Sequence, residues 1–375
     1  MDTCDVAIIG AGPAGAAAAR ECVRHGLKTV VIEKRTLPRH KACSGILIPR
    51  SRSLVQDHFG PIPPSIIADP PVIRLMRMHF PSGRIIDIPI DGTGIWRNTF
   101  DAWLCERAGA EMRESTACVS CKEQGDGVVL ALRTARDAHV PLQCRVLIVA
   151  NGGTSSLVRD LDPSFYDGVP SYFNLQEVYP CASRLEAGVF HYFAMPAISP
   201  YPSAYVKDGV LVMEVAVRAG DSAGAALSRF REYLWPRIGV TGAEPERRVG
   251  CWVTMTAPQG GFYFGTDRIL VAGEASGLLN LFGEGISSAL ASGIRAGRAA
   301  VNGIRDDRPP GPSYRRAVQP ERRRTEEQYR YGRLIFRTSG VFDWRSALRD
   351  RSLPERVLLV TDLVLWFLRL KRATR

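Results

Sequence analysis

The stretch from Asp5 to Glu33, DVAIIGAGPAGAAAARECVRHGLKTVVIE, decides the fold. It opens with a short apolar run typical of a buried parallel strand, and the alanine-rich segment from Pro13 to His25 predicts a helix. Gly26 stands where a helix C-cap is expected, and a second apolar run follows from Lys28 to Ile32. The stretch therefore predicts a β-α-β unit with two parallel strands.

The turn inside this unit is Gly10-Ala11-Gly12-Pro13-Ala14-Gly15, and Glu33 ends the second strand. Gly10 allows the tight turn, Gly12 lets a pyrophosphate approach the backbone, and Gly15 lets helix and strand pack closely. The helix start around Ala14 offers N–H groups and positive potential to phosphates. The Glu33 carboxylate can accept hydrogen bonds from both ribose hydroxyls. These residues predict a dinucleotide-binding site; the alternative is a glycine-rich turn that serves packing alone.

Length and cysteine content limit the class of protein. A chain of 375 residues predicts two domains rather than one core. Nine cysteines are scattered without a disulfide framework, so we expect reduced thiols and a cytoplasmic protein. Cys118 and Cys121 form a CxxC pair, but no second pair or nearby histidine completes a zinc set, so packing is preferred and no metal is expected. No stretch reaches the roughly 18 to 20 apolar residues of a membrane-spanning helix.

The net charge of +11 is concentrated near the C-terminus, where Val301 to Arg375 hold 18 Lys and Arg against 9 Asp and Glu. Aromatic residues are not interleaved with these bases, so no nucleic-acid partner is expected. The charge predicts either a solvated helical surface or docking on an anionic membrane or acidic partner. The apolar stretch from Arg356 to Arg372 has basic ends, so it either contacts the inner membrane surface peripherally or packs against the first domain. The sequence carries no signal for an oligomeric state.

Further runs indicate how the chain is organised. We expect a hairpin at Arg74 to Phe80 and Arg84 to Ile90, a helix at Thr99 to Ala110, and strands at Val128 to Arg133 and Arg145 to Ala150. From about Val169 to Trp252 the pattern indicates an antiparallel sheet with a covering helix, and its clearest elements are strands at Val189 to Met195 and Val210 to Val217 and a helix near Ala225 to Leu234. A buried strand at Arg268 to Ala272 and a small-residue helix at Gly285 to Asn302 then return to the first domain.

The predicted fold class is α/β within an α+β whole. A Rossmann-type nucleotide-binding domain is expected at 1–73, 91–165 and 265–305, with an inserted antiparallel-sheet substrate domain at 74–90 and 166–264. A helical C-terminus is expected at 306–375.

A later segment indicates which dinucleotide binds. Gly273-Glu274-Ala275-Ser276-Gly277 follows the strand ending at Ala272, and Phe282-Gly283-Glu284-Gly285-Ile286 opens the long helix. This arrangement resembles the "GDAAG…P…GEGI…A…SG" segment of the geranylgeranyl reductase family of FAD-dependent oxidoreductases, which are related to the aromatic-hydroxylase flavoproteins. In that family the acid binds the ribityl or phosphate part, and the second glycine pair places a helix N-terminus beneath the flavin pyrimidine. The resemblance implies FAD contacts at Gly273, Glu274, Gly283, Gly285 and Ile286, where helix N–H groups stabilise the anionic reduced flavin.

Three more stretches carry the same resemblance. Pro38-Arg39-His40-Lys41-Ala42-Cys43-Ser44-Gly45 is similar to the family's "R-x-K-x-C-G-G" loop, which approaches the flavin ring. The stretch from Arg97 to Leu104 resembles the "R-x-x-F-D-x-W-L" helix, whose leading arginine contacts the flavin. The stretch from Ala150 to Arg159 matches "A-D-G-x-x-S-x-V-A-R". The resemblance adds Arg39, Lys41, Ser44 and Arg97 to the expected cofactor contacts.

The sequence also departs from the family pattern. Glu274 replaces an Asp, which moves the carboxylate outward by about 1.5 Å and shifts its cofactor contacts. Asn151 replaces the Asp of a motif associated with nicotinamide access, so the electron donor is expected to be NADPH, NADH or a separate reductase. Ser44 replaces a Gly. The family's "Y-x-W-x-F-P-K-G" signature survives only in part, from Tyr201 to Asp208, where Tyr201, Tyr205 and Lys207 remain; this indicates a reshaped substrate pocket.

Cys43 is the candidate catalytic residue. In a loop beside the flavin, its thiol could give a proton to one alkene carbon while flavin N5 delivers hydride to the other; the alternative is an inert packing cysteine. His191, Tyr201 and Tyr205 are candidates for the substrate pocket, although histidines and aromatic residues on sheets more often serve structure.

Three functions follow from these residues. The first is FAD-dependent reduction of carbon–carbon double bonds in an isoprenoid or other apolar small molecule. The second is a monooxygenase or halogenase-like enzyme that uses a C4a-peroxyflavin, because the fold alone does not separate the two chemistries. The third, of another class, is a catalytically silent flavin-binding partner protein. The Cys43 loop favours the reductase.

Overall fold

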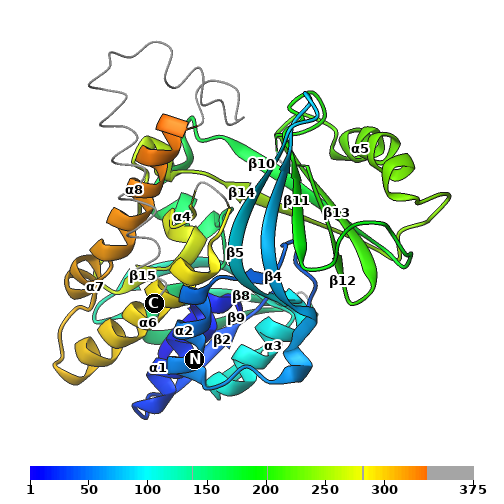
Figure 1. Cartoon of the computed structure of the whole chain (residues 1–375). Helices are drawn as coiled ribbons and strands as arrows, with labels where there is room; N and C mark the ends of the chain where they lie inside the picture. The colour runs from blue at the N-terminus through cyan, green and yellow to red at the C-terminus, as the bar shows by residue number, and fades with distance from the viewer. Residues whose placement is uncertain (137, 201, 281–282, 336–375) are drawn as a thin grey trace.

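The computed structural model describes residues 1–136, 138–200, 202–280 and 283–335, which form two sheets with helices around them (Figure 1). The α-helices are α1 (Pro13–Arg24), α2 (Pro49–Phe59), α3 (Arg97–Ala108), α4 (Ser156–Leu161), α5 (Ala223–Ile238), α6 (Ile286–Arg305), α7 (Gly311–Ala317) and α8 (Gln319–Ile335). The strands are β1 (Asp2–Ile9), β2 (Thr29–Ile32), β3 (Ile46–Leu47), β4 (Ile67–His79), β5 (Ile85–Ile95), β6 (Glu111–Arg113), β7 (Thr116–Gln124), β8 (Gly127–Thr134), β9 (His139–Val149), β10 (Ser171–Tyr179), β11 (Val189–Phe193), β12 (Ser203–Lys207), β13 (Val210–Arg218), β14 (Arg247–Thr254) and β15 (Ile269–Val271). Short 3-10 helices are η1 (Pro64–Ile66), η2 (Pro163–Tyr166), η3 (Ala257–Gln259) and η4 (Gly273–Ser276).

The first sheet has the strand order β6-β2-β1-β9-β8-β7, and β15 also pairs with β9. The β6, β2, β1, β9 and β15 neighbours are parallel, whereas β7 and β8 are added antiparallel. Helices α1, α3 and α6 pack on one face of this sheet, and α4 packs on the other. Burial on both faces explains the continuous apolar runs of β1 and β2. The predicted Rossmann-type fold is therefore confirmed.

Helices α1 and α6 approach each other closely because small residues line their contact. A methyl group on Gly293 would collide with the carbonyl oxygen of Ala14, and one on Gly297 would lie 2.8 Å from the carbonyl oxygen of Ala18. The buried Ala-rich face of α1 complements these glycines. This contact brings the start of α1 next to the polypeptide that leads into α6.

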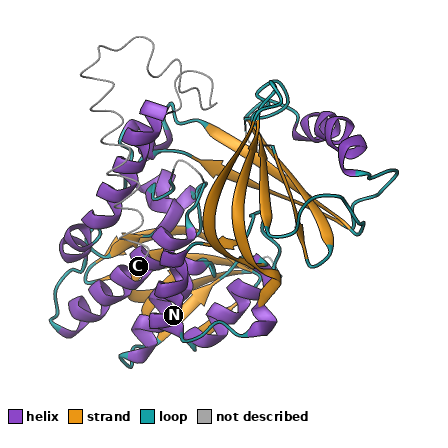
Figure 2. Ribbon diagram, in the orientation of Figure 1, coloured by secondary structure: helices purple, strands orange, loops and turns teal. Residues whose placement is uncertain are grey.

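The second sheet has the order β14-β10-β13-β12-β11-β4-β5-β3, and α5 covers its outer face (Figure 2). All its pairs are antiparallel except β4 with β11. The β4–β5 hairpin is longer than the predicted one at Arg74 to Phe80 and Arg84 to Ile90, and register shifts around Ile73 interrupt its pairing. By pairing, β3, the whole of β4 and the whole of β5 belong to this sheet.

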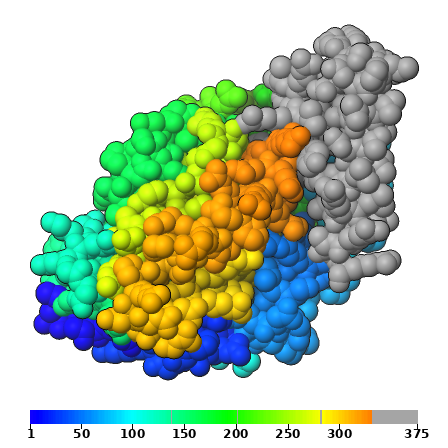
Figure 3. Space-filling model, turned by 90° about the vertical axis from the view of Figure 1, so that its left-hand side faces the viewer, coloured from blue at the N-terminus to red at the C-terminus, as the bar shows by residue number. Residues whose placement is uncertain are grey.

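Helices α7 and α8 follow α6 and lie on the surface, where Figure 3 shows α8 in orange. The buried Glu321 of α8 accepts a bidentate hydrogen bond from Arg50 of α2 at 2.6 Å and pairs with Arg295 of α6 at 3.2 Å. Within the described parts of the chain, no helix combines the length and apolarity needed to cross a bilayer. The expected apolar helix at 356–372 lies outside the described residues, so its membrane contact stays a prediction.

Candidate flavin site

The glycine-rich turn between β1 and α1 has the backbone that the motif predicts. Gly10 has φ +105°, and a side chain there would come within 2.6 Å of the carbonyl oxygen of Ala150. A methyl group on Gly15 would collide with the carbonyl oxygen of Gly10. Gly12 has open space in front of its backbone, and the nearest groups to a methyl placed there are the guanidinium nitrogens of Arg39 and Arg97, at 3.9 and 4.0 Å. At Gly12 the turn therefore has no side chain between its backbone and the guanidinium groups of Arg39 and Arg97.

Glu33, at the end of β2, fixes one side of this turn. Its Oε2 accepts a hydrogen bond from the Ala11 amide at 3.0 Å and lies 3.3 Å from Nε of Arg39. The carboxylate is buried, and each oxygen has a second lone pair available. In a dinucleotide-binding unit, an acid at this position accepts hydrogen bonds from the ribose hydroxyls.

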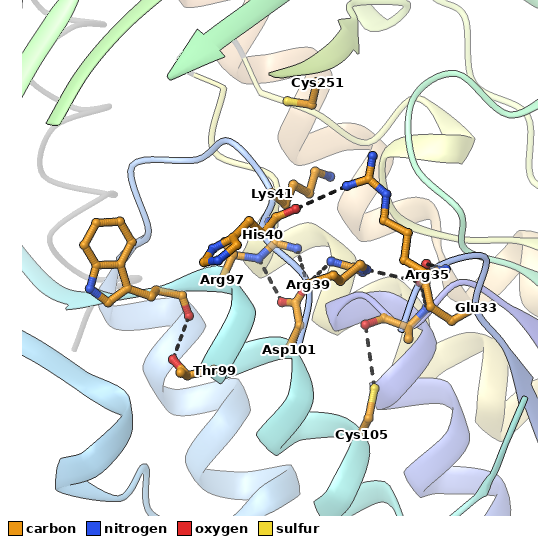
Figure 4. A network of polar contacts seen from close by, with 12 residues as sticks. Glu33, Arg35, Arg39, His40, Lys41, Arg97, Thr99, Asp101, Cys105 and Cys251 are labelled. Carbon is orange, nitrogen blue, oxygen red and sulfur yellow. Dashed lines mark hydrogen bonds and ion pairs between the residues drawn. The ribbon is translucent and has the colours of Figure 1, made fainter. Parts of the chain in front are cut away.

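Arg39 and Arg97 share one buried carboxylate, that of Asp101 (Figure 4). Arg97 donates from Nε and Nη2 to the two Asp101 oxygens at 2.8 Å, and Arg39 donates from Nη1 at 3.0 Å. Burial opposes the charge on Arg97, but the charge of Asp101 and its hydrogen bonds raise the arginine pKa above its usual value. The Glu33 carboxylate also lies 3.3 Å from Arg39, so two anions balance the two cations, and the arginines offer hydrogen-bond donors to a pyrophosphate beside Gly12.

Glu274, the residue that departs from the family's Asp, occupies the end of β15. Its Oε1 is buried and has no hydrogen-bond partner among the described residues, whereas its Oε2 lies 3.8 Å from Lys41 Nζ. A methyl group on Gly153 would collide with this carboxylate. Gly153 therefore makes room for the longer acid, and an unpaired buried oxygen is left to accept a hydrogen bond from a bound hydroxyl.

The glycine pairs at 273 and 285 lie beside the first turn. Gly273 has φ +68°, and a methyl group there would lie 3.1 Å from Cβ of Ala14. Its amide donates to Ser292 of α6 at 2.9 Å. Gly283 has φ +73°, Gly285 precedes α6 as its N-cap, and Ile286 is the first residue of the helix and is buried. The turn at Gly10, the Arg97 helix and the start of α6 thus converge on one region.

The Cys43 loop lies between this region and the second sheet. Gln176 of β10 donates to the carbonyl oxygen of Cys43 at 3.1 Å, and Lys207 of β12 donates to that of Ser44 at 2.5 Å. Arg97 also makes a side-chain contact with Cys43. Tyr205 faces the same side of the sheet and donates to Glu214 of β13 at 2.8 Å. Burial and the Glu214 charge raise the pKa of Tyr205, so it stays protonated.

The expected pocket residue His191 does not face this place. His191 pairs with Ala204 in the register of β11 and β12, and Ala204 packs in the cluster under α5, so His191 faces away from Tyr205. It contacts His79 at 3.0 Å instead. Alternation along the strand puts its neighbour Phe190 on the site face, against Tyr205 at 5.3 Å. Tyr201 lies outside the described residues.

Some residues of the site were not expected from the sequence. Asp101 stands four residues after Arg97, which is the spacing of a helical ion pair and is a usable signal. Glu214 interrupts the apolar run VLVMEVAV, and a lone acid inside a buried strand needs a partner. Its partners include Gln176, which lies 38 residues earlier in the sequence and carried no local signal.

The residues present fit FAD: an open glycine turn, a ribose acid, two arginines that can donate to phosphate, and one buried carboxylate oxygen of Glu274 without a partner among the described residues. Fold and site define a flavin-dependent oxidoreductase. A family model for FAD-dependent oxidoreductases matches residues 5–82.

Proteins of similar sequence and structure identify the family within this class of oxidoreductases. A menaquinone reductase of Mycobacterium tuberculosis is 30% identical over 317 residues, covering 78% of this chain and 75% of the relative. A digeranylgeranylglycerophospholipid reductase of Methanosphaera stadtmanae is 27% identical over 324 residues, covering 80% and 79%. The solved structure of a geranylgeranyl bacteriochlorophyll reductase-like protein from Thermoplasma acidophilum matches with a TM-score of 0.78 at 19% identity, over 97% of this chain and 100% of that one. Flavin-dependent halogenases share the fold. The chain belongs to the geranylgeranyl reductase family of FAD-dependent oxidoreductases, and it is an enzyme that uses FAD.

Proposed function

We propose that this enzyme reduces carbon–carbon double bonds of an isoprenoid or a similarly apolar substrate, with Cys43 as the proton donor. The observation that carries the proposal is the face of the second sheet that contacts the Cys43 loop. On this face, one row of paired residues changes from polar to apolar, and the neighbouring row is apolar apart from Tyr205. The names of the reductases to which the chain is similar support the same substrate class.

Strand registers define one such row. Gln176, Glu214 and Ser203 are successive partners on β10, β13 and β12, and all three are buried polar residues. The same row continues through Tyr192, Met78 and Ile86 on β11, β4 and β5.

The neighbouring row is apolar apart from Tyr205. Its members from β10 to β5 are Val178, Val212, Tyr205, Phe190, Met76 and Ile88, and the last three side chains are half-buried. A polar end beside Cys43 and an apolar extension across three strands suit a molecule with a long hydrocarbon part.

The chemistry needs a hydride and a proton. FAD supplies, when bound and reduced, a hydride for one alkene carbon. The Cys43 thiol holds the proton that forms the second C–H bond, and its S–H bond breaks to leave a thiolate. Arg97 contacts this sulfur, and its positive charge favours the thiolate that remains. Solvent then returns a proton to the sulfur.

We further propose that NADPH or NADH, directly or through a separate reductase, supplies the electrons. Asn151 is exposed at the end of β9, beside the chain segment that holds Gly153 against Glu274. An anaerobic titration of the flavoprotein with each nicotinamide tests the direct route. Bleaching of the flavin absorbance by either one supports it, and an unchanged spectrum assigns the role to a separate reductase.

The substrate proposal is tested by reducing the flavoprotein anaerobically and adding a polyprenyl alcohol or its diphosphate. We expect reoxidation of the flavin with formation of the saturated product. Cys43→Ser should bind FAD and accept electrons normally, yet reoxidise at least about tenfold more slowly, since general acid catalysis contributes 10²–10⁴-fold. Cys181→Ser, at a half-buried thiol in the cluster under α5, is the matched control. Failure of every alkene to reoxidise the flavin would contradict the proposal, and turnover only with oxygen would favour a monooxygenase.

A further inference from the structure

Two successive carbonyl groups of the Cys43 loop are held by side chains of the second sheet. Gln176 Nε2 on β10 donates to the Cys43 carbonyl at 3.1 Å, and Lys207 Nζ on β12 donates to the Ser44 carbonyl at 2.5 Å. The loop itself comes from the segment between β2 and β3. The sheet that faces the substrate therefore fixes the backbone of the residue that faces the flavin.

Lys207 is an unusual residue for such a place. Its side chain is 2% exposed, and among the described residues it forms no ion pair with a carboxylate. Its ammonium group donates to the carbonyl oxygens of Ser44 and Ile95, at 2.5 and 3.0 Å, and lies 4.5 Å from the Trp96 ring centroid. Burial lowers the pKa of Lys207 to about 8, so the amine remains largely charged at neutral pH. A buried charge without a counter-ion is costly, and a methionine would fill the same space without that cost.

The carbonyl of Ile95 is part of the same arrangement. Ile95 ends β5 and precedes Trp96 and Arg97, the residues that start α3. Gly45 has φ +65°, and a methyl group there would collide with the Ile95 carbonyl and lie 3.0 Å from Lys207 Nζ. One ammonium group thus joins the Cys43 loop to the helix that carries the flavin arginine.

A hydrogen bond to Glu214 also holds the Gln176 side chain in place. Its Nε2 also donates to Glu214, and Glu214 accepts from Tyr205 at 2.8 Å. Because carbonyl and carboxylate oxygens only accept, the amide nitrogen must face both Cys43 and Glu214. The orientation of Gln176 is therefore determined by Glu214, and it cannot turn away from the loop without losing two hydrogen bonds.

We propose that Lys207 and Gln176 are positioning residues that aim the Cys43 thiol. They act through the loop and do not touch the reacting carbons. The inference deepens the proposed function, because it assigns what prepares Cys43 for proton transfer.

Three variants separate the contributions of the two residues. Lys207→Met removes the hydrogen bonds to the Ser44 and Ile95 carbonyls, whereas Lys207→Arg keeps a cationic donor. Gln176→Leu removes the hydrogen bond to the Cys43 carbonyl together with the one to Glu214. A positioning role of the Lys207 hydrogen bonds predicts that Lys207→Arg restores what Lys207→Met loses.

The test measures the rate at which iodoacetamide alkylates Cys43 in the FAD-loaded protein, with the modified peptide quantified by mass spectrometry, and the rate at which alkene reoxidises the reduced flavin. Lys207→Met and Gln176→Leu should change the alkylation rate and slow the reoxidation about tenfold, because the thiol is misplaced, and Lys207→Arg should restore both rates. Cys181 in the same samples is the internal reference and should not change.

Each outcome decides the question. An unchanged Cys43 alkylation rate in folded, FAD-loaded Lys207→Met would overturn the proposal. If Lys207→Met does not fold, Gln176→Leu tests the same role, and a Cys43 alkylation rate equal to that of the parent would refute it. An alkylation rate that changes in Lys207→Met and is restored in Lys207→Arg, in a protein that reduces no alkene, would support the positioning role and count only against the proposed substrate chemistry.

Discussion

At Gly12 and Gly15, a single methyl group should have opposite consequences. Gly12→Ala meets only ordinary contacts, with Arg39 and Arg97 at 3.9 and 4.0 Å, so the apoprotein should keep its stability. The methyl would stand where the pyrophosphate approaches the backbone, so FAD affinity should fall at least about tenfold. Gly15→Ala should instead destabilise the fold by roughly 1 to 3 kcal/mol or more, because the methyl collides with the Gly10 carbonyl.

Flavin fluorescence quenching and urea unfolding measure the two effects. The pair is its own control, because both changes add the same methyl group to the same turn. Gly12→Ala that binds FAD as tightly as the parent would show that phosphate does not approach this backbone.

Asp101 is the single carboxylate between two arginines, so its loss should be severe. Asp101 is fully buried and Arg97 is 8% exposed. Asp101→Asn keeps the shape but leaves the buried Arg97 without its anion and Arg39 with Glu33 alone, and we expect a loss of about 3 to 5 kcal/mol in the free energy of unfolding. Asp306→Asn, at an exposed ion pair with Arg305, is the matched control and should be silent in the same urea titration. Equal effects of the two changes would argue against the buried pair.

At the scale of elements, the parallel contact between β4 and β11 contains a pair of histidines. His79 and His191 are hydrogen bonded at 3.0 Å, and burial lowers the pKa of His191 to about 4. The folded pKa lies below the unfolded value near 6.5, so the protein binds a proton less readily when folded. Stability from neutral His191 is therefore fully present above pH 6.5 and is lost as the pH falls toward 4.

Replacing His191 should make the free energy of unfolding depend less on pH below about pH 6.5. Between pH 6.5 and 4.5, parent protein should lose about 2 kcal/mol more than His191→Asn, which keeps a polar partner for His79 but does not titrate. His139→Asn, at an exposed position at the start of β9, serves as the control. Urea unfolding at several pH values gives the curves, and identical acid slopes for parent and His191→Asn would refute the assignment.

At the scale of the whole molecule, α8 is tied to the flavin region by buried charge. Glu321 pairs with Arg50, and Arg50 also donates to Ser287 at 3.3 Å, in the first turn of α6. Glu321→Gln should cost about 3 kcal/mol, because two arginines lose their anion. Glu326→Gln, at the half-exposed pair with Arg322, should cost less than about 1 kcal/mol.

The destabilisation caused by Glu321→Gln should also be detectable in the chain around α8. Limited proteolysis should cut the connection between α6 and α7 sooner in this variant than in the parent, because α8 is held less firmly. FAD affinity should fall as well, since Ser287 accepts from Arg50 and donates to Glu284 beside Gly285. A variant with parent-like cleavage and FAD binding would show that α8 is independent of the site.

Local sequence determined the nucleotide half of this protein. The strand, turn and helix from Asp5 to Glu33 form as predicted, because a glycine turn, an apolar run and an alanine-rich helix are each decided by neighbours in sequence. The helix at Arg97, the strand before Gly273 and the long helix α6 also form where expected. Their residues carry their own signals, so the fold class followed from the sequence.

Only the tertiary structure decided which side chains meet Cys43. Gln176, Lys207 and Glu214 come from three strands, and strand register selects which residues share a face. A shift of one residue would have put His191 on the site face and Phe190 under α5, and no local pattern distinguishes these neighbours. Register is set by pairing over long sequence separations and by burial against α5, so it is a property of the assembled sheet rather than of any one segment.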